Sequence, residues 1–176
     1  IRKIDLKSEG VSTLKPRKIW FDDIVQRLNV DERGELLGEF KGEDRLLIIN
    51  QKGDVKTIKP ELTTHFDNDM IVLEKWDPQK PISAIYFDGE KERYYLKRFM
   101  IDNPNKDENF ITDHVKSQLE IVCTDYRPMV EIKFSKRSLE NLEVNMEEFI
   151  SVKGIKALGN QLTAEKIKTV DMLEPL

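Results

Sequence analysis

The residues of this chain that could do chemistry do not complete a phosphate-binding motif. Gly154 and Gly159 have the spacing of the two glycines in a phosphate-binding loop. Asn160 and Gln161 then stand where that motif requires a lysine followed by Ser or Thr, so the chain supplies neither an ammonium for the β- and γ-phosphates nor a hydroxyl for magnesium. We interpret the two glycines as a tight turn that leads into a strand.

Metal and cofactor sites are not indicated either. The segment Asp67-Asn68-Asp69 begins like a calcium-binding loop, but apolar residues follow where further oxygen ligands and a glycine are needed. His65 and His114 are far apart in the sequence, and the single Cys123 cannot complete a zinc cluster with them. We therefore expect no metal and no cofactor in this chain.

Cys123 is the residue that an enzyme would use as its nucleophile. It lies in an alternating apolar segment, where a cysteine behaves as a small hydrophobic residue, and its spacing to His114 does not favour a Cys-His pair. A single cysteine also forms no internal disulfide, which is typical of a reducing cytoplasm. We predict no catalytic residues, and an enzyme built on Cys123 ranks last of three functional hypotheses.

Strand signals recur from end to end of the chain. Gly53 in the turn 51–54 and the pair Asp88-Gly89 signal hairpins, because glycine accepts the positive φ of tight turns. Strands are predicted at Leu46–Asn50, Val55–Ile58, Met70–Trp76, Ile82–Phe87, Tyr94–Phe99, Leu119–Cys123 and Val130–Phe134. Asn145 predicts the N-cap of one short helix that reaches Phe149, while residues 163–170 fit a helix or a strand equally well.

These strands predict a mostly β fold with an internal repeat. Similar segments recur about every 40 residues, which is the spacing of a four-stranded propeller blade. We predict a single propeller-like domain, closed or as an open spiral, of about four hairpin-based, four-stranded blades. The approximate units are 1–40, 41–81, 82–128 and 129–176. A β-sandwich is the alternative.

The charge of the chain limits how it can meet nucleic acid. Its net charge of −4 argues against a protein that simply coats DNA. Residues 1–60 carry 13 Lys/Arg against 11 Asp/Glu, and residues 61–176 carry 16 against 22, so a DNA-binding face must be local and the first third is favoured. The chain has no signal-peptide pattern and no apolar run long enough for a bilayer. It begins at Ile1, and we expect a piece of a longer protein.

Basic residues beside turns and aromatic side chains are the remaining candidates. Each one alone is an ordinary solvated side chain, but their repetition in successive units suggests a basic rim that contacts successive phosphates. The predicted DNA-binding residues are Arg17, Lys18, Arg33, Lys52, Lys56, Lys97, Arg98, Lys153 and Lys156.

Two segments resemble a known repeat. Asp44–Ile58 is similar to the repeat that builds the C-terminal domain of the A subunit of bacterial DNA gyrase and topoisomerase IV, with an aspartate, an aliphatic strand, a turn glycine and a second strand carrying basic residues. Phe149–Leu158 resembles the connection between blades in that family, and the resemblance is best over residues 44–159. The glycine- and arginine-rich box of gyrase is missing, so the topoisomerase IV type is preferred over gyrase.

The resemblance implies a β-pinwheel, in which neighbouring blades exchange strands and basic residues on the outer rim bend DNA. It implies a non-catalytic part of a type IIA topoisomerase, an isomerase of the bacterial cytoplasm that relaxes or decatenates DNA with a catalytic tyrosine outside this chain. The implied partners are duplex DNA, the topoisomerase B subunit and the N-terminal part of the A subunit, without a membrane. ATP and magnesium would be bound elsewhere in the holoenzyme.

The second hypothesis is a propeller-type protein-interaction scaffold that does not bind DNA. The acidic balance after residue 60 supports it. Such a scaffold would expose a patch of aromatic residues where a DNA-binding domain exposes a basic stripe.

Overall fold

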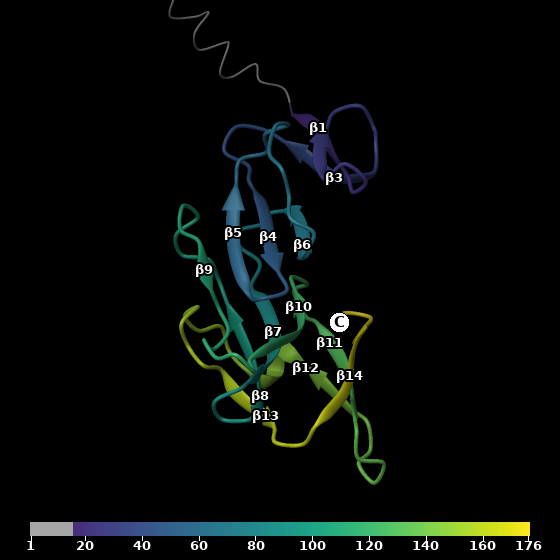
Figure 1. The fold of residues 1–176 in the computed structure, drawn as a ribbon, viewed down its shortest axis with the longest axis vertical. Coiled ribbons are helices and arrows are strands. Elements are labelled where there is room, and N and C mark those ends of the chain that lie inside the picture. Colours follow the sequence, from purple (N-terminus) through teal and green to yellow (C-terminus); the bar gives the residue numbers. More distant parts are fainter. Residues whose placement is uncertain (1–15) are drawn as a thin grey trace, which may run out of the picture. The chain divides into compact units, whose positions relative to one another are not determined.

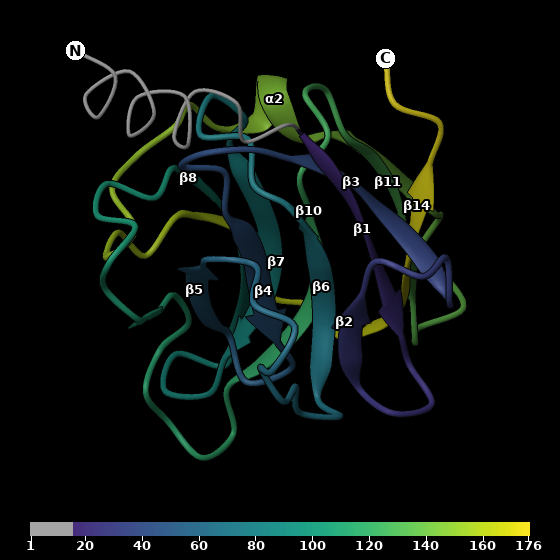
Figure 2. The ribbon, with the colours of Figure 1, turned by 90° about the horizontal axis from the view of Figure 1, so that it is seen from above.

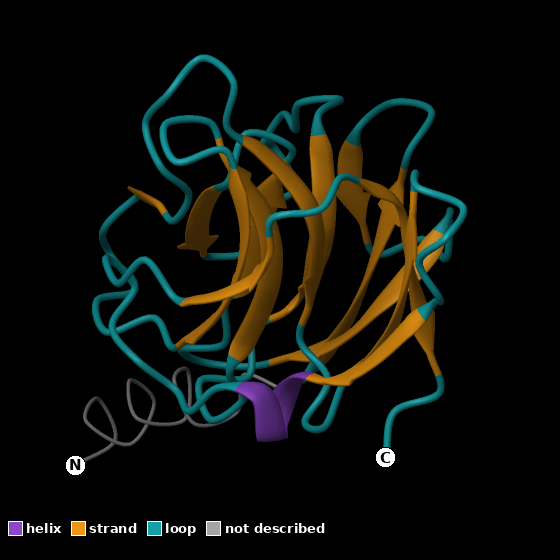
Figure 3. Cartoon of the chain, turned by 90° about the horizontal axis from the view of Figure 1, so that it is seen from below, coloured by secondary structure: helices purple, strands orange, loops and turns teal. Residues whose placement is uncertain are grey.

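The computed structural model describes residues 16–176, which form four antiparallel β-sheets and one short helix (Figures 1 and 3). The described chain divides into two compact units. The first runs up to Asn50 and adds Val55–Trp76 and Pro104–Asp107. The second consists of Gln51–Asp54, Asp77–Asn103 and Glu108–Leu176. No helix among the described residues is long and apolar enough to cross a bilayer.

The first unit contains two sheets around one hydrophobic core. One sheet has the order β2-β1-β3, with β1 at Arg17–Asp22, β2 at Arg27–Asn29 and β3 at Glu35–Phe40 (Figure 2). In the other sheet β4 (Leu46–Asn50) lies between β5 (Asp54–Ile58) and β6 (Met70–Lys75). The core contains Ile19, Leu28, Phe40, Leu46, Ile48 and Phe66. The continuous aliphatic run of β4 is buried along its length because both of its faces are covered.

The second unit also contains two sheets. One has the order β10-β7-β8-β13, with β7 at Ile82–Asp88, β8 at Arg93–Phe99, β10 at Gln118–Cys123 and β13 at Asn160–Thr163. The other has the order β12-β11-β14, with β11 at Met129–Phe134, β12 at Leu142–Asn145 and β14 at Ile167–Leu173. Their core includes Ile85, Leu96, Val130, Ile132 and Met146. Two of the four sheets therefore have four strands as predicted, and two have three.

Strands cross from one sheet to another, as the resemblance implied. β13 follows the β11–β12 hairpin in sequence but pairs with β8, placing Asn160 opposite Leu96, before β14 returns to β11. The short β9 (Glu108–Asn109) likewise lies between β8 and β10 in sequence but joins the sheet of β5. It lies beside Asp54, whose carboxylate accepts a hydrogen bond from Asn109 Nδ2 at 2.8 Å. The mostly β architecture with strand exchange is thus confirmed.

Polar side chains hold the backbone carbonyls of the crossing segments. In the first unit, Arg45 Nη2 and Thr57 Oγ1 both donate to the carbonyl of Pro104, at 3.2 and 2.7 Å. In the second unit, the Tyr86 hydroxyl donates to the carbonyl of Leu158 at 2.6 Å. A buried carbonyl without a partner costs about 1–3 kcal/mol, so these donors allow the segments to pack inside. We call these donors the clamp side chains.

The turns follow the sequence signals in part. Gly53 has φ +86°, as its turn requires. The β7–β8 hairpin is confirmed, but it closes with the four-residue loop 89–92, in which Glu92 has φ +54°. Asp88 causes this difference, because its buried carboxylate accepts hydrogen bonds from the backbone N–H groups of Glu90 and Lys91 and draws the loop around itself.

The predicted helix is present, and the ambiguous segment is a strand. α2 spans Met146–Phe149, and Asn145 caps it by accepting hydrogen bonds from the N–H groups of Glu147 and Glu148 at 3.1 and 3.3 Å. Residues 163–170 contain the start of β14, since pairing with β11 supplies backbone partners that an isolated helix lacks.

Candidate nucleic-acid interface

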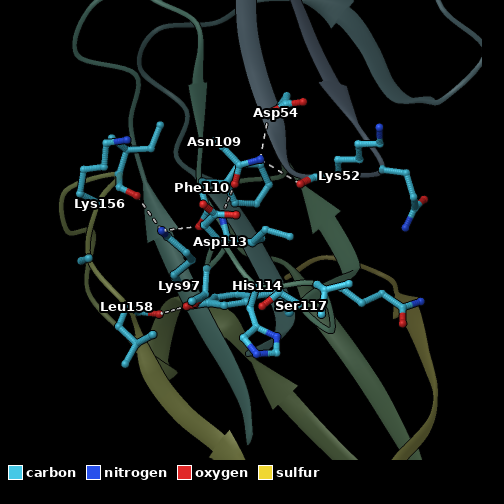
Figure 4. Close-up of a pocket in the computed structure, with 18 residues that line it drawn as sticks. Lys52, Asp54, Lys97, Asn109, Phe110, Asp113, His114, Ser117, Lys156 and Leu158 are labelled. Atoms are coloured by element: carbon cyan, nitrogen blue, oxygen red, sulfur yellow. Dashed lines mark hydrogen bonds between the residues drawn. The ribbon is translucent and has the colours of Figure 1, made fainter. Parts of the chain in front are cut away.

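An open pocket of about 850 Å³ in the second unit brings three of the predicted basic residues together (Figure 4). Lys52 comes from the turn before β5, Lys97 from β8 and Lys156 from the turn before β13. These three residues are distant in sequence. The strand-exchanging connections, which carry Phe110 and Ile155 past β8, gather them around one space.

Lys97 lies at the inner end of this group and, like the clamp side chains, binds backbone carbonyls of crossing segments. Its side chain is 3% exposed, and its ammonium donates to the carbonyls of Phe110 and Ile155, both at 2.7 Å. Burial, together with repulsion from Lys156, lowers the pKa of Lys97 to about 8. The sequence predicted Lys97 on a DNA-contacting rim, whereas in the structure its side chain is buried and its ammonium binds two backbone carbonyls.

Arg98 is also internal. It is 5% exposed, and its guanidinium donates to Ser83 Oγ at 3.0 Å and to the carbonyl of Tyr126 at 3.3 Å. Its own carbonyl accepts from the N–H of Lys153 at 2.9 Å, so it fixes the backbone from which the exposed Lys153 side chain extends. Burial lowers the pKa of Arg98. Arg98 therefore positions a candidate contact and does not face DNA itself.

Lys52 and Lys156 are the exposed cations of the pocket. Asp54 and Asp113 line the same space, so the positive charge is locally offset. The carboxylate of Asp54 is engaged with Asn109, and His114 Nδ1 accepts from the N–H of Lys116 at 3.0 Å.

Four predicted DNA-binding residues lie in the first unit and are exposed, but each has a carbonyl or carboxylate neighbour. Arg17 donates to the carbonyl of Pro60 at 3.2 Å, and Arg33 pairs with Asp31 at 3.4 Å. Lys18 stands directly opposite Glu39 in the β1–β3 ladder. Lys56 lies on the exposed face of β5, beside a pocket of about 280 Å³ that is also lined by Glu61, Asp67 and Asp69. Each of these four cations therefore has a carbonyl or a carboxylate nearby.

A second group of exposed cations was not among the DNA-binding residues predicted from the sequence, which ranked Lys166 and Lys168 below Lys52, Lys56, Lys97 and Arg98. It consists of Lys133, Lys136, Arg137, Lys166 and Lys168, and we call it the hairpin-tip cluster. The N–H of Ser135 donates to the carbonyl of Lys166 at 3.0 Å, which joins the tip of the β11–β12 hairpin to the turn before β14. The adjacent Lys136 and Arg137 between two strands were the available signal, but their neighbours lie about thirty residues later and are recruited only by the β11–β14 pairing.

The residues considered for chemistry have other roles in the described chain. Cys123 is buried in β10, and its thiol donates to Asp125 Oδ2 at 3.1 Å, while His114 is engaged with Lys116. Among residues 16–176 no group of three His, Cys, Asp or Glu side chains has the geometry of a metal site. Gly154 begins a turn that the N–H of Ala157 closes, and β13 follows it.

Comparison with known proteins identifies the domain. A family model described as the topoisomerase C-terminal domain of Bacteroidota matches residues 27–174. The chain belongs to this family. No curated protein sequence matches it.

Solved structures of topoisomerase C-terminal domains have the same fold. The E. coli ParC C-terminal domain superposes with a TM-score of 0.55 at 9% identity, over 90% of this chain and 80% of that one. A C-terminal domain of DNA topoisomerase IV superposes with a TM-score of 0.51 at 15% identity, over 96% of this chain and 56% of that one. This topoisomerase C-terminal domain is therefore a β-pinwheel, and it spans little more than half of the second structure.

Proposed function

We propose that this topoisomerase C-terminal domain binds and bends duplex DNA as a non-catalytic part of a topoisomerase IV A subunit. The observation that carries the proposal is a β-pinwheel of this family with exposed cations on its surface, among them Lys52, Lys153 and Lys156. Lysine and arginine side chains that neutralise phosphates release counterions, which gives binding energy that does not depend on sequence.

The parent enzyme would supply everything that this chain does not contribute. In that arrangement the chain delivers duplex DNA to a break-and-rejoin centre in the preceding part of the A subunit, and a B subunit provides ATP hydrolysis with magnesium. Relaxation or decatenation in the bacterial cytoplasm would be the overall reaction. The exposed surface of this chain needs only to hold and curve the duplex.

The test is a titration of a labelled duplex with the 176-residue chain at several salt concentrations, followed by fluorescence anisotropy. We expect micromolar or weaker affinity and a logarithmic salt slope of about −3 to −5, the value for a few neutralised phosphates. Binding that is indifferent to salt, or no binding at low ionic strength, would contradict the proposal.

A protein-interaction surface is the second candidate, and the first unit carries an observation in its favour. Ile24 in the β1–β2 turn is 88% exposed, and Val25, Val30 and Leu62 are also exposed. Three of these line a shallow pocket of about 450 Å³. The aromatic patch that a scaffold would show is not observed, since Tyr126 is the one strongly exposed aromatic residue of the described chain. The same titration separates the two candidates, because a scaffold alone gives no salt-dependent DNA binding.

A further inference from the structure

The hairpin-tip cluster places five cations together at one end of the β12-β11-β14 sheet. Lys133, Lys136, Arg137, Lys166 and Lys168 are all exposed. None of them forms an ion pair or a side-chain hydrogen bond with another residue of the described chain, in contrast to Arg33, Lys75 and Arg127, which do. None of the five is therefore held in an ion pair by a carboxylate of the described chain, although the exposed Glu165 precedes Lys166 in the sequence.

The backbone beneath these cations is firmly held. Phe134 pairs with Ile167 in the β11–β14 ladder, and both pack on the core of the second unit. The N–H of Ile167 also donates to the Tyr94 hydroxyl at 3.4 Å. A register shift between Lys133 and Phe134 leaves Lys168 as an extra residue opposite them, so that cations from both strands lie close together. Lys133 and Lys168 thus lie on paired strands, while Lys136, Arg137 and Lys166 lie in the loops that adjoin them.

Carboxylates occupy the next row of the same sheet. Glu131 stands directly opposite Glu143 on one side and Asp171 on the other. Like charges placed opposite each other in a sheet destabilise it, so this row has a cost that the fold tolerates. Glu131 precedes Lys133 by two residues, which is about 7 Å along a strand. Within the strands of this sheet, the row of carboxylates is therefore followed by Lys133 toward the hairpin tip.

We propose that the hairpin-tip cluster is a main contact for the DNA phosphate backbone, an inference that rests on the proposed function. The row of Glu131, Glu143 and Asp171 confines the duplex to this end of the sheet. Neighbouring phosphates meet up to five cations at the tip and are repelled by three carboxylates one row away. The duplex then crosses the end of the sheet and does not run along its face. This surface differs from the pocket that holds Lys52, Lys97 and Lys156.

The composition of the cluster favours DNA over an acidic protein. Within residues 133–138 and 163–169 no large hydrophobic side chain is strongly exposed. Protein–protein interfaces, in contrast, have an apolar centre. Ser135 and Ser138 are exposed beside the cations and present small hydroxyls that permit close approach of a phosphate. Phosphate contacts of this kind position a duplex without reading its sequence.

The experiment compares two charge-reversal pairs at equivalent hairpin tips of the second unit. Lys136→Glu with Arg137→Glu removes the centre of the hairpin-tip cluster. Lys91→Glu with Arg93→Glu changes the same charge at the β7–β8 tip, where Glu90 and Glu92 already alternate with the cations. All four side chains are exposed, and Arg93 Nη1 also donates to the carbonyls of Lys91 and Glu92, so circular dichroism and thermal unfolding check that both variants fold.

We expect the Lys136/Arg137 variant to lose at least about tenfold in duplex affinity and to flatten the logarithmic salt slope by about 2. The Lys91/Arg93 variant should change affinity less than about threefold. Neutralising the acidic row with Glu131→Gln, Glu143→Gln and Asp171→Asn should increase affinity, because it removes repulsion without touching a cation.

The outcomes separate this inference from the proposed function. If the unmodified chain binds DNA and the two charge-reversal variants weaken it equally, the hairpin-tip cluster is not the contact, and DNA binding itself stands. If the unmodified chain does not bind duplex at low ionic strength, both fail. A stronger loss in the Lys136/Arg137 variant, with a gain on neutralising the acidic row, supports both.

Discussion

Lys97 and Arg98 are buried basic residues whose charged groups donate hydrogen bonds inside the protein. Lys97 also lies over the rings of Phe99 and Phe110, with its ammonium 5.4 and 5.9 Å from their centroids. These two rings and the two carbonyl acceptors surround the desolvated ammonium of Lys97. A lysine or arginine that recurs beside strands in each unit can therefore be a clamp for a crossing segment, and recurrence alone does not identify a DNA contact.

The lowered pKa of Lys97 makes stability depend on pH. Its pKa is about 8 in the folded protein and 10.5 as a free side chain. Between pH 8 and 10 the unfolded chain holds a proton that the folded chain has released, so the free energy of unfolding should rise with pH, by on the order of 1–3 kcal/mol in total. Above pH 10 the opposite slope begins, because desolvation raises the pKa of Tyr86 to about 12 and the folded state keeps its proton longer.

Urea unfolding of the protein and of Lys97→Met across pH 7 to 10 measures this effect. The variant should lose the rise between pH 8 and 10, whereas the exposed control Lys91→Met should keep it. A rise of equal size in Lys97→Met would assign the effect to another group.

At the scale of elements, the exchange of β13 depends on one glycine. Gly159 has φ +95°, and a Cβ added there would lie 2.5 Å from the carbonyl oxygen of Leu96, on the strand that β13 joins. Glycine is needed because the backbone both adopts a left-handed conformation and approaches β8 closely. Gly154, five residues earlier, has no positive φ and no neighbour within 4 Å of an added Cβ.

Gly159→Ala should therefore lower the free energy of unfolding by about 2 kcal/mol or more, from backbone strain and the displaced β13–β8 ladder. Gly154→Ala is the matched control and should change it by less than about 0.5 kcal/mol. Chemical denaturation of both variants, with hydrogen exchange at Leu96 as a local readout, checks the prediction. Equal stability of the two variants would show that β13 does not need this turn.

At the scale of the whole molecule, the proposed DNA binding by a protein with net charge −4 requires local groups of cations. In the proposed function, the exposed cations of the pocket and of the hairpin-tip cluster would contact phosphates of the DNA backbone. Binding energy of this type comes from counterion release and carries little sequence information.

Duplexes of equal length and unrelated sequence should therefore bind within about threefold of one another. Competition of a labelled duplex with several unlabelled ones at constant salt measures this. A preference of more than about a hundredfold for one sequence would indicate base readout and would contradict a backbone-only contact.

The sequence by itself determined the strands between Leu46 and Phe134 that form the main hairpins, the capped helix and the resemblance to the family. Alternating apolar residues in β10 and β11, the turn glycine Gly53 and the N-cap Asn145 act through neighbours a few residues away, so their effect is readable along the chain. The four-residue β7–β8 loop differed from a tight Asp-Gly turn because the Asp88 carboxylate is buried, and burial depends on distant residues.

Only the tertiary structure decided which cations face solvent. Lys97 and Lys156 look alike in the sequence, but one binds two carbonyls inside the protein and the other is exposed, because strand exchange carries Phe110 and Ile155 past β8. The pairing of β11 with β14 likewise assembles the hairpin-tip cluster from two separate segments. Charges interact through space, so which cations gather on the surface depends on how strands that are remote in sequence pair. Local sequence patterns do not specify these pairings.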